Sequence, residues 1–207
     1  DWDGVPLIIS RTGWSSELGY EIFLRDGSAG DKLWEHIMQV GTPLGLKPGH
    51  TSSIRRIEAG MMSYHADMTL ANNPYELNLG RLVDLDIDAG FVSKAALKDI
   101  KAEGVAQRLI GLEIDGEPLV GSNDFCWPVL VEGAQVGQLT SAIHSPRLGK
   151  NIALAMVQSE HASVGGVLRL RGDRGVVLPR RRGRGGGVGR GTRPASVGVP
   201  GHVRGRA

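Results

Sequence analysis

The sequence predicts an α+β protein with a mixed helix-and-strand part, then a small antiparallel β-barrel, then an Arg/Gly-rich tail. Three patterns lead to this fold class. Strand and helix patterns alternate up to Gly104, short apolar runs separated by Gly or Pro follow, and all periodicity stops near Gly172. We therefore expect a first part over 1–104, a barrel over 105–171 and a disordered tail over 172–207.

The first part is expected to hold three strands and three helices. The strands are short apolar or alternating runs at Val5–Ser10, Tyr20–Leu24 and Leu79–Asp88. The first helix follows an Asp-Gly turn, has Ser28 and Asp31 as a capping box and stops at Gly41. Its apolar face is formed by Leu33, Trp34, Ile37 and Val40.

The remaining elements follow in order along the chain. Thr51–Ser53 can cap a second helix, and a third helix is predicted over Ser93–Glu103, capped by Ser93 and closed by Gly104. Short connections between the later strands favour an antiparallel sheet or barrel. These strands are Arg108–Asp115, Trp127–Glu132, Gln135–Ile143, Asn151–Val157 and Leu168–Arg171.

The tail has an unusual composition. The formal net charge of the chain is only +2, but residues 169–207 hold eleven Arg against the single Asp173. Such a segment would bind phosphate groups in a salt-dependent way. Because it contains no Phe, Tyr or Trp, it offers no stacking platform, and we expect no specific nucleic-acid partner. A shifted reading frame of a GC-rich gene, beginning near 165–175, would also encode this composition.

Several classes of protein are excluded. The chain has no run of about 18 apolar residues and does not begin as a signal peptide does, so we expect a cytoplasmic protein without a membrane partner. The single Cys126 cannot form an internal disulfide and is expected to be packed as a small hydrophobe. We predict no metal, because no metal-ligand spacing occurs among His36, His50, His65, His144 and His161.

Two clusters could carry binding chemistry. Glu21 and Phe23 share one face of the second predicted strand, where an aromatic beside a carboxylate could bind a flat, amide-rich heterocycle. Spacing alone favours the simpler alternative that Glu21 is solvated. In the second predicted helix, either Arg55 pairs weakly with Glu58 or one of Arg55 and Arg56 clamps a carboxylate, and spacing does not decide between them.

Four motifs in a fixed order resemble one family. They are RTGWSSELGYEI at Arg11–Ile22, RIEAG at Arg56–Gly60, FVSKAAL at Phe91–Leu97 and SPRLGKNI at Ser145–Ile152. Together they look like the tetrahydrofolate-dependent family of the glycine-cleavage T-protein. The resemblance implies the C-terminal part of a folate-binding α/β domain followed by a barrel domain, with tetrahydrofolate as cofactor.

The resemblance also implies site residues. Glu21 matches the family's pterin-binding carboxylate, and Trp14 matches an aromatic that would stack on the folate or face a sulfonium. Arg56 matches an Arg that would contact the folate carboxylate or hold Glu21. The family's catalytic-region Asp would lie in an N-terminal half outside these 207 residues, so the catalytic residue is unknown and the chain alone is expected to be inactive.

Within the family, the chain is most similar to the dimethylsulfoniopropionate demethylase branch. The matching segments are Gly13–Glu17, Asp26–Ser28, Ala66–Glu76 and Arg81–Leu85. Leu79–Arg81 and Tyr64–His65 depart from the usual aminomethyltransferase pattern. The resemblance implies methyl transfer from a small-molecule sulfonium to tetrahydrofolate. Aminomethyl transfer and non-catalytic folate binding are the alternatives, and the oligomeric state stays open.

Overall fold

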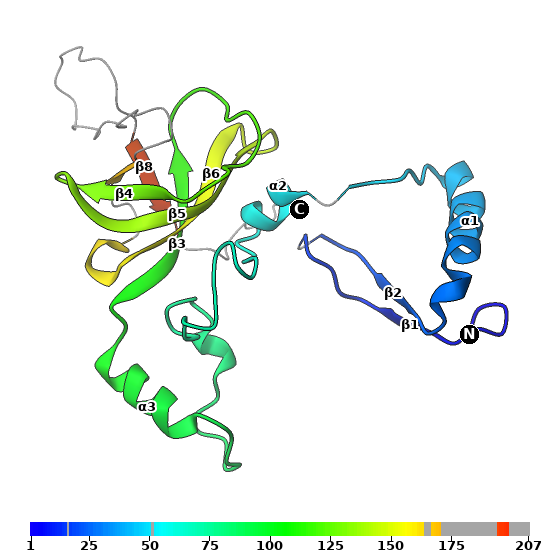
Figure 1. Cartoon of the computed structure of the whole chain (residues 1–207), viewed down its shortest axis with the longest axis horizontal. Coiled ribbons are helices and arrows are strands. Elements are labelled where there is room, and N and C mark those ends of the chain that lie inside the picture. Colours follow the sequence, from blue (N-terminus) through cyan, green and yellow to red (C-terminus); the bar gives the residue numbers. More distant parts are fainter. Residues whose placement is uncertain (16, 51, 164–166, 171–193, 199–207) are drawn as a thin grey trace, which may run out of the picture. The chain divides into compact units, whose positions relative to one another are not determined.

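The computed structural model describes residues 1–15, 17–50, 52–163, 167–170 and 194–198 (Figure 1). The chain forms two compact units, Asp1–Arg55 and Arg56–Ala207. The mixed helix and strand content and the antiparallel sheets confirm the predicted α+β class. Among the described residues, no helix combines the length and the apolar character needed to cross a membrane.

The first unit contains a two-stranded antiparallel sheet and a helix. Strand β1 (Leu7–Ser10) pairs with β2 (Glu21–Leu24), and α1 spans Gly30–Gly41. In this register, Ile8 lies opposite Phe23 and Ser10 opposite Glu21, so these four side chains share one face. None of the unit's described residues is fully buried.

The chain enters α1 differently from the prediction. The expected capping box of Ser28 and Asp31 is wrong, because a 3-10 turn over Gly27–Ala29 comes first and Ala29 precedes the helix without a side-chain cap. Asp26 caps that turn instead. Its carboxylate accepts bonds from the hydroxyl and then the backbone N–H of Ser28, at 2.7 and 3.0 Å, and these bonds lower the pKa of Asp26.

Helices α2 (Ser53–Glu58) and α3 (Lys94–Glu103) agree with the predicted positions, and Gly104 ends α3 with a φ of 85°. The predicted cap by Ser93 is wrong, because Ser93 has a left-handed backbone with a φ of 68° and makes no side-chain cap bond. The strand predicted over Leu79–Asp88 is wrong. A 3-10 turn occupies Gly80–Leu82, and the Asp84 side chain accepts from the N–H groups of Asp86 and Ile87, which satisfies this backbone locally.

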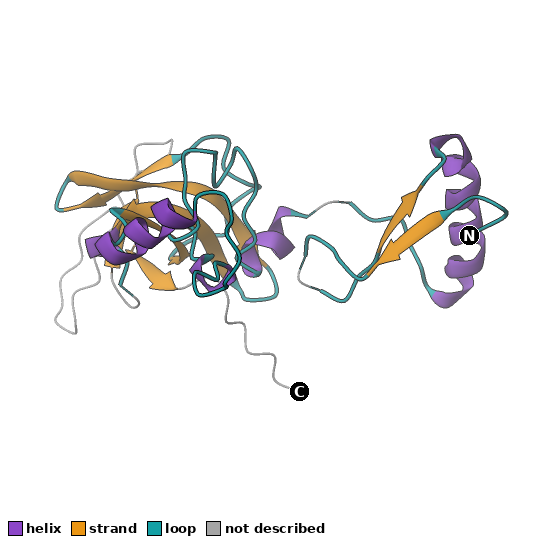
Figure 2. Ribbon diagram, turned by 90° about the horizontal axis from the view of Figure 1, so that it is seen from below, coloured by secondary structure: helices purple, strands orange, loops and turns teal. Residues whose placement is uncertain are grey.

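The second unit is built on a closed barrel, which Figure 2 shows from a second direction. The strand order around it is β3-β6-β5-β4-β7-β8, and all pairings are antiparallel. The strands are β3 (Gln107–Ile114), β4 (Trp127–Val131), β5 (Ala134–Ser145), β6 (Lys150–Gln158), β7 (Val167–Leu170) and β8 (Pro194–Gly198).

Strand β6 is buried on both faces. Ala153, Ala155 and Val157 belong to a core cluster shared with Val129 and Leu139. The alternate residues Ile152, Leu154 and Met156 belong to a second cluster with Ile57 of α2 and Leu77. Burial on both faces explains why β6 is a nearly continuous apolar run. The 56–79 segment therefore packs on the barrel.

This packing also explains where the chain divides into its two compact units. The compact units divide at Arg55, whereas the sequence pattern changes after Gly104. The structural division falls earlier because Ile57, Leu77 and the partly buried Leu79 join the cluster that covers β6. The boundary at 104/105 stays a prediction about sequence domains.

Two expectations at the surface are wrong. Cys126 is exposed, because it lies in the loop just before β4. Part of the tail predicted to be disordered is a strand, since β8 pairs with both β3 and β7. A strand pairs through its backbone groups, which the amino-acid composition does not reveal. Pro194 is the first residue of β8, a position where the missing N–H of proline is tolerated. The rest of the predicted tail lies outside the described residues.

Gly137 of β5 provides a test of the barrel packing. A Cβ there would lie 2.2 Å from the carbonyl oxygen of Met156, so Gly137→Ala is expected to destabilise the barrel by about 1–3 kcal/mol. Chemical denaturation followed by the indole NMR signal of Trp127 in β4 measures this. Gly90→Ala is the control, because its Cβ would meet nothing within 4 Å. Equal stability of the two variants would contradict the packing.

Candidate functional site

The loop after β1 and residues around the start of α2 line a pocket in the first unit. Its volume is about 250 Å³, and its lining residues are Trp14, Ser15, His50, Ser52 and Arg55. Trp14 is 49% exposed. Nη1 of Arg55 lies 3.3 Å from Oε1 of Glu17, and both side chains are about half exposed. The pocket therefore combines an aromatic surface with an ion pair at its edge.

Glu21 lies on the polar end of the β1–β2 sheet. It is exposed, and its carboxylate accepts a hydrogen bond from the Thr12 hydroxyl, which lies 3.0 Å from the hydroxyl of Ser10. Phe23, 51% exposed, shares its face two residues along. The predicted pairing of a carboxylate with an aromatic on one strand face is therefore present, with Thr12 orienting the carboxylate.

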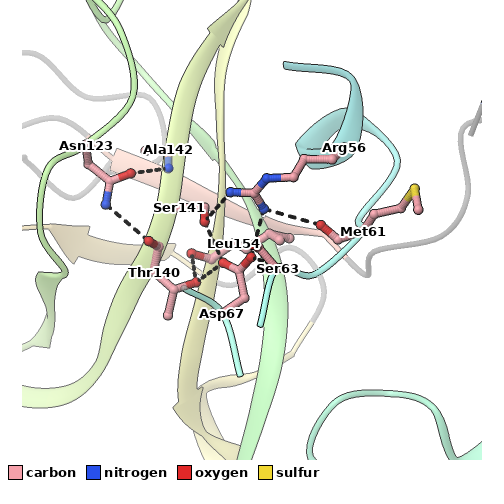
Figure 3. A network of polar contacts seen from close by, with 9 residues as sticks. All are labelled: Arg56, Met61, Ser63, Asp67, Asn123, Thr140, Ser141, Ala142 and Leu154. Atoms are coloured by element: carbon pink, nitrogen blue, oxygen red, sulfur yellow. Dashed lines mark hydrogen bonds and ion pairs between the residues drawn. The ribbon is translucent and has the colours of Figure 1, made fainter. Parts of the chain in front are cut away.

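Arg56 is the centre of a buried polar network (Figure 3). Its side chain is 9% exposed, and Nη1 lies 2.8 Å from Oδ2 of Asp67, whose side chain is fully buried. Nη2 donates to the hydroxyl of Ser141 at 2.9 Å, and Nη1 also lies 3.3 Å from the carbonyl oxygen of Met61. The guanidinium therefore connects α2 to the loop after it and to β5.

Asp67 accepts bonds from three more groups, and a β-bulge explains two of them. The Ser63 N–H donates to Oδ2 at 2.8 Å, and the hydroxyls of Thr140 and Ser141 each donate to Oδ1 at 2.6 Å. Consecutive strand residues normally point to opposite faces. The register between β5 and β6 shifts at Thr140, and such a bulge lets neighbouring side chains reach the same carboxylate.

Two of the motifs meet at Glu58. Its side chain is 1% exposed and lies 2.6 Å from Nη2 of Arg147, and it accepts a bond from the fully buried Ser145. The Ser145 hydroxyl also accepts the N–H of Leu148 at 3.0 Å, which fixes the turn between β5 and β6. Glu58 is thus bound to the SPRLGKNI motif, and Arg55 forms an ion pair with Glu17.

The sequence reasoning found some of these residues and missed others. Trp14 and Glu21 both belong to the first unit, and Arg56 belongs to the second. Asp67 was missed, since one Asp in an irregular segment gives no periodic signal. Among the described residues, no group of three or more His, Cys, Asp or Glu side chains could hold a metal ion.

Comparison with known domains decides the family. The GCVT N-terminal domain matches residues 1–87, and the glycine cleavage T-protein C-terminal barrel domain matches residues 107–179. The chain belongs to the glycine-cleavage T-protein family. Members of this family are tetrahydrofolate-dependent methyl- and aminomethyltransferases.

Curated relatives of this T-protein-family chain carry two different activities in their names. A dimethylsulfoniopropionate demethylase of Ruegeria pomeroyi is 38% identical over 164 residues, covering 79% of this chain and 44% of the relative. An aminomethyltransferase of Herpetosiphon aurantiacus is also 38% identical, over 165 residues, with the same coverage of both chains. The chain thus spans a little under half the length of these relatives.

A solved structure supports the fold of this T-protein-family chain. The crystal structure of the glycine cleavage system aminomethyltransferase T from Bartonella henselae matches with a TM-score of 0.72. It covers 94% of this chain and 49% of that chain, at 18% sequence identity. At this identity the match establishes the fold.

Proposed function

We propose that this chain is the pterin-binding and barrel part of a methyltransferase that demethylates dimethylsulfoniopropionate. The products are methylmercaptopropionate and 5-methyltetrahydrofolate. The observation that carries the donor assignment is the pocket lined by the half-exposed Trp14 and by Arg55, which pairs with the carboxylate of Glu17. An indole face and a carboxylate both attract a sulfonium cation. The Ruegeria pomeroyi relative supports the same donor.

Tetrahydrofolate is proposed to bind at the polar end of the β1–β2 sheet. The edge of a pterin presents adjacent N–H donors, and a carboxylate is a two-oxygen acceptor, so Glu21 can accept both. Phe23 on the same face offers its ring as a surface for the flat heterocycle. Thr12 holds one oxygen of Glu21 by its hydroxyl bond. A folate contact by Arg56 stays a prediction from the resemblance.

The chemistry requires little of the protein beyond alignment. Tetrahydrofolate, when bound, supplies the N5 nucleophile, so that a sulfur–methyl bond breaks, a nitrogen–methyl bond forms, and a neutral thioether and the N5 proton leave. Trp14 and Glu17 would hold the cationic end of the donor, and Glu21 would fix the pterin. Holding two reactants in line removes much of the entropic barrier, and excluding water strengthens these electrostatic contacts.

The first unit is proposed to need the rest of the fold found in its relatives. Several of its apolar side chains are 50% exposed or more, including Ile8, Ile9, Phe23 and Trp34. Exposed apolar patches of this kind mark interaction surfaces. Since the relatives are about twice as long as the matched segment, we propose that their additional part covers these side chains and completes the catalytic site.

Aminomethyl transfer is the second candidate function. The observation that favours it is the Herpetosiphon aurantiacus aminomethyltransferase, which is as similar as the demethylase in both identity and coverage. This reaction would use the same pterin contact by Glu21 but a different donor.

A chimera separates the two functions. In it, the aligned segment of this chain replaces that of the Ruegeria pomeroyi demethylase, and the purified protein receives tetrahydrofolate with either dimethylsulfoniopropionate or an aminomethyl donor of the glycine cleavage system. We expect 5-methyltetrahydrofolate to form when dimethylsulfoniopropionate is the donor, and we expect no transfer from the aminomethyl donor. Turnover only with the aminomethyl donor would favour the second function, and folate binding without turnover would favour a non-catalytic role.

A further inference from the structure

The two adjacent arginines of α2 lie in different surroundings. Arg56 is 9% exposed and is bound to Asp67 and Ser141. Arg55 is 43% exposed and lines the pocket of Trp14. The sequence leaves open which Arg could clamp a carboxylate. In the structure, Arg55 lines a cavity of about 250 Å³, whereas Arg56 holds the protein's own carboxylate.

We infer that Arg55 binds the carboxylate of the methyl donor and thereby selects a small zwitterion. This inference rests on the proposed function, which names the donor but not how its carboxylate is held. Dimethylsulfoniopropionate carries a sulfonium and a carboxylate a few bonds apart. The pocket edge carries the complementary arrangement, with Arg55 and Glu17 in contact at 3.3 Å. A zwitterion lies antiparallel on such a pair, with its carboxylate on Arg55 and its cation toward Glu17.

The chemistry of the guanidinium permits both contacts at once. Arg presents five N–H donors in a planar fork, so one nitrogen can pair with Glu17 while others bind a second carboxylate. The indole of Trp14 lines the same pocket and offers its face to the sulfonium. His50 lines it as well and can donate one ring N–H to the same ligand carboxylate.

The size of the pocket is consistent with a small donor. Its volume of about 250 Å³ lies just below the range of roughly 300–1,000 Å³ that is usual for drug-sized ligands. A donor without a carboxylate would gain nothing from Arg55. Arg55 therefore favours a sulfonium donor that carries its own carboxylate. It gives no advantage to a donor whose one-carbon group has no carboxylate nearby.

The test measures binding to the full 207-residue chain. The indole NMR signal of Trp14, assigned with Trp14→Phe, is followed while dimethylsulfoniopropionate or trimethylsulfonium, which lacks the carboxylate, is added. Arg55→Gln is expected to weaken binding of dimethylsulfoniopropionate by roughly tenfold or more and to leave trimethylsulfonium unchanged. Arg55→Lys should bind at an intermediate level, and the exposed Arg25→Gln is the matched control.

The same Arg55 variants, made in the chimera, distinguish a failure of the Arg55 inference from a failure of the proposed function. If the unmodified chimera demethylates the donor and Arg55→Gln leaves its KM unchanged, the inference is wrong and the proposed function stands. If that chimera transfers no methyl group but the Trp14 signal of the chain shifts in an Arg55-dependent way, the carboxylate site stands and the proposed function fails. Absence of any Trp14 shift, or equal weakening for both ligands, overturns the inference.

Discussion

Asp67→Asn is expected to destabilise the second unit by about 3–5 kcal/mol, because it removes the charge that compensates the buried guanidinium of Arg56. The new amide would also place N–H donors against the donors of Ser63, Thr140 or Ser141. This loss is a large part of the stability of a typical domain. Chemical denaturation followed by the Trp127 indole signal measures it.

A matched substitution controls for the loss of one carboxylate. Asp115→Asn changes an exposed residue just after β3 and should alter the free energy of unfolding by less than about 0.5 kcal/mol. If Asp67→Asn is no more destabilising than this control, Asp67 and Arg56 do not form the buried network that connects α2 to β5.

Glu21→Gln is expected to weaken tetrahydrofolate binding by about 1–3 kcal/mol, roughly 5- to 150-fold. The substitution replaces one acceptor oxygen with a donor, which would face an N–H of the pterin edge. The chimera, titrated with tetrahydrofolate in a calorimeter, is the protein in which to measure this. Glu35→Gln on α1 removes the same charge from an exposed position of the same unit and should leave the affinity unchanged.

An unchanged tetrahydrofolate affinity in Glu21→Gln would mean that Glu21 is the solvated carboxylate that spacing alone favoured. Equal losses in Glu21→Gln and Glu35→Gln would point to the net charge of the unit and not to a specific contact. Neither result would affect the family assignment, which rests on the matched domains.

The elements that sequence predicted best are those with strong local patterns. Strands β3 to β7 begin and end within two residues of the predicted bounds, because apolar runs and turn residues mark both ends. Leu79–Asp88 has the same alternation, yet its Asp84 side chain bonds the local backbone and a turn forms. Strand β8 was missed because pairing through the backbone leaves little trace in composition.

The site residues, like the fold elements, were predictable where the signal is local and unpredictable where it depends on distant partners. Trp14 and Glu21 could be named from one contiguous motif, and their exposure is consistent with binding. The different surroundings of Arg55 and Arg56 could not be predicted, because they depend on Asp67 and Ser141, which are distant in sequence. The bulge at Thr140 is likewise a property of the paired strands and not of either strand alone.

The measurement that tests the central claim most directly follows one isotopic label. The chimera is incubated with tetrahydrofolate and dimethylsulfoniopropionate carrying ¹³C in its sulfonium methyl groups, and the products are identified by ¹³C NMR. We expect one label to move to N5 of tetrahydrofolate and the other to stay in methylmercaptopropionate, and we expect no transfer by the isolated chain. Label that remains entirely on the sulfonium, while an aminomethyl donor is consumed by the same preparation, would contradict this expectation.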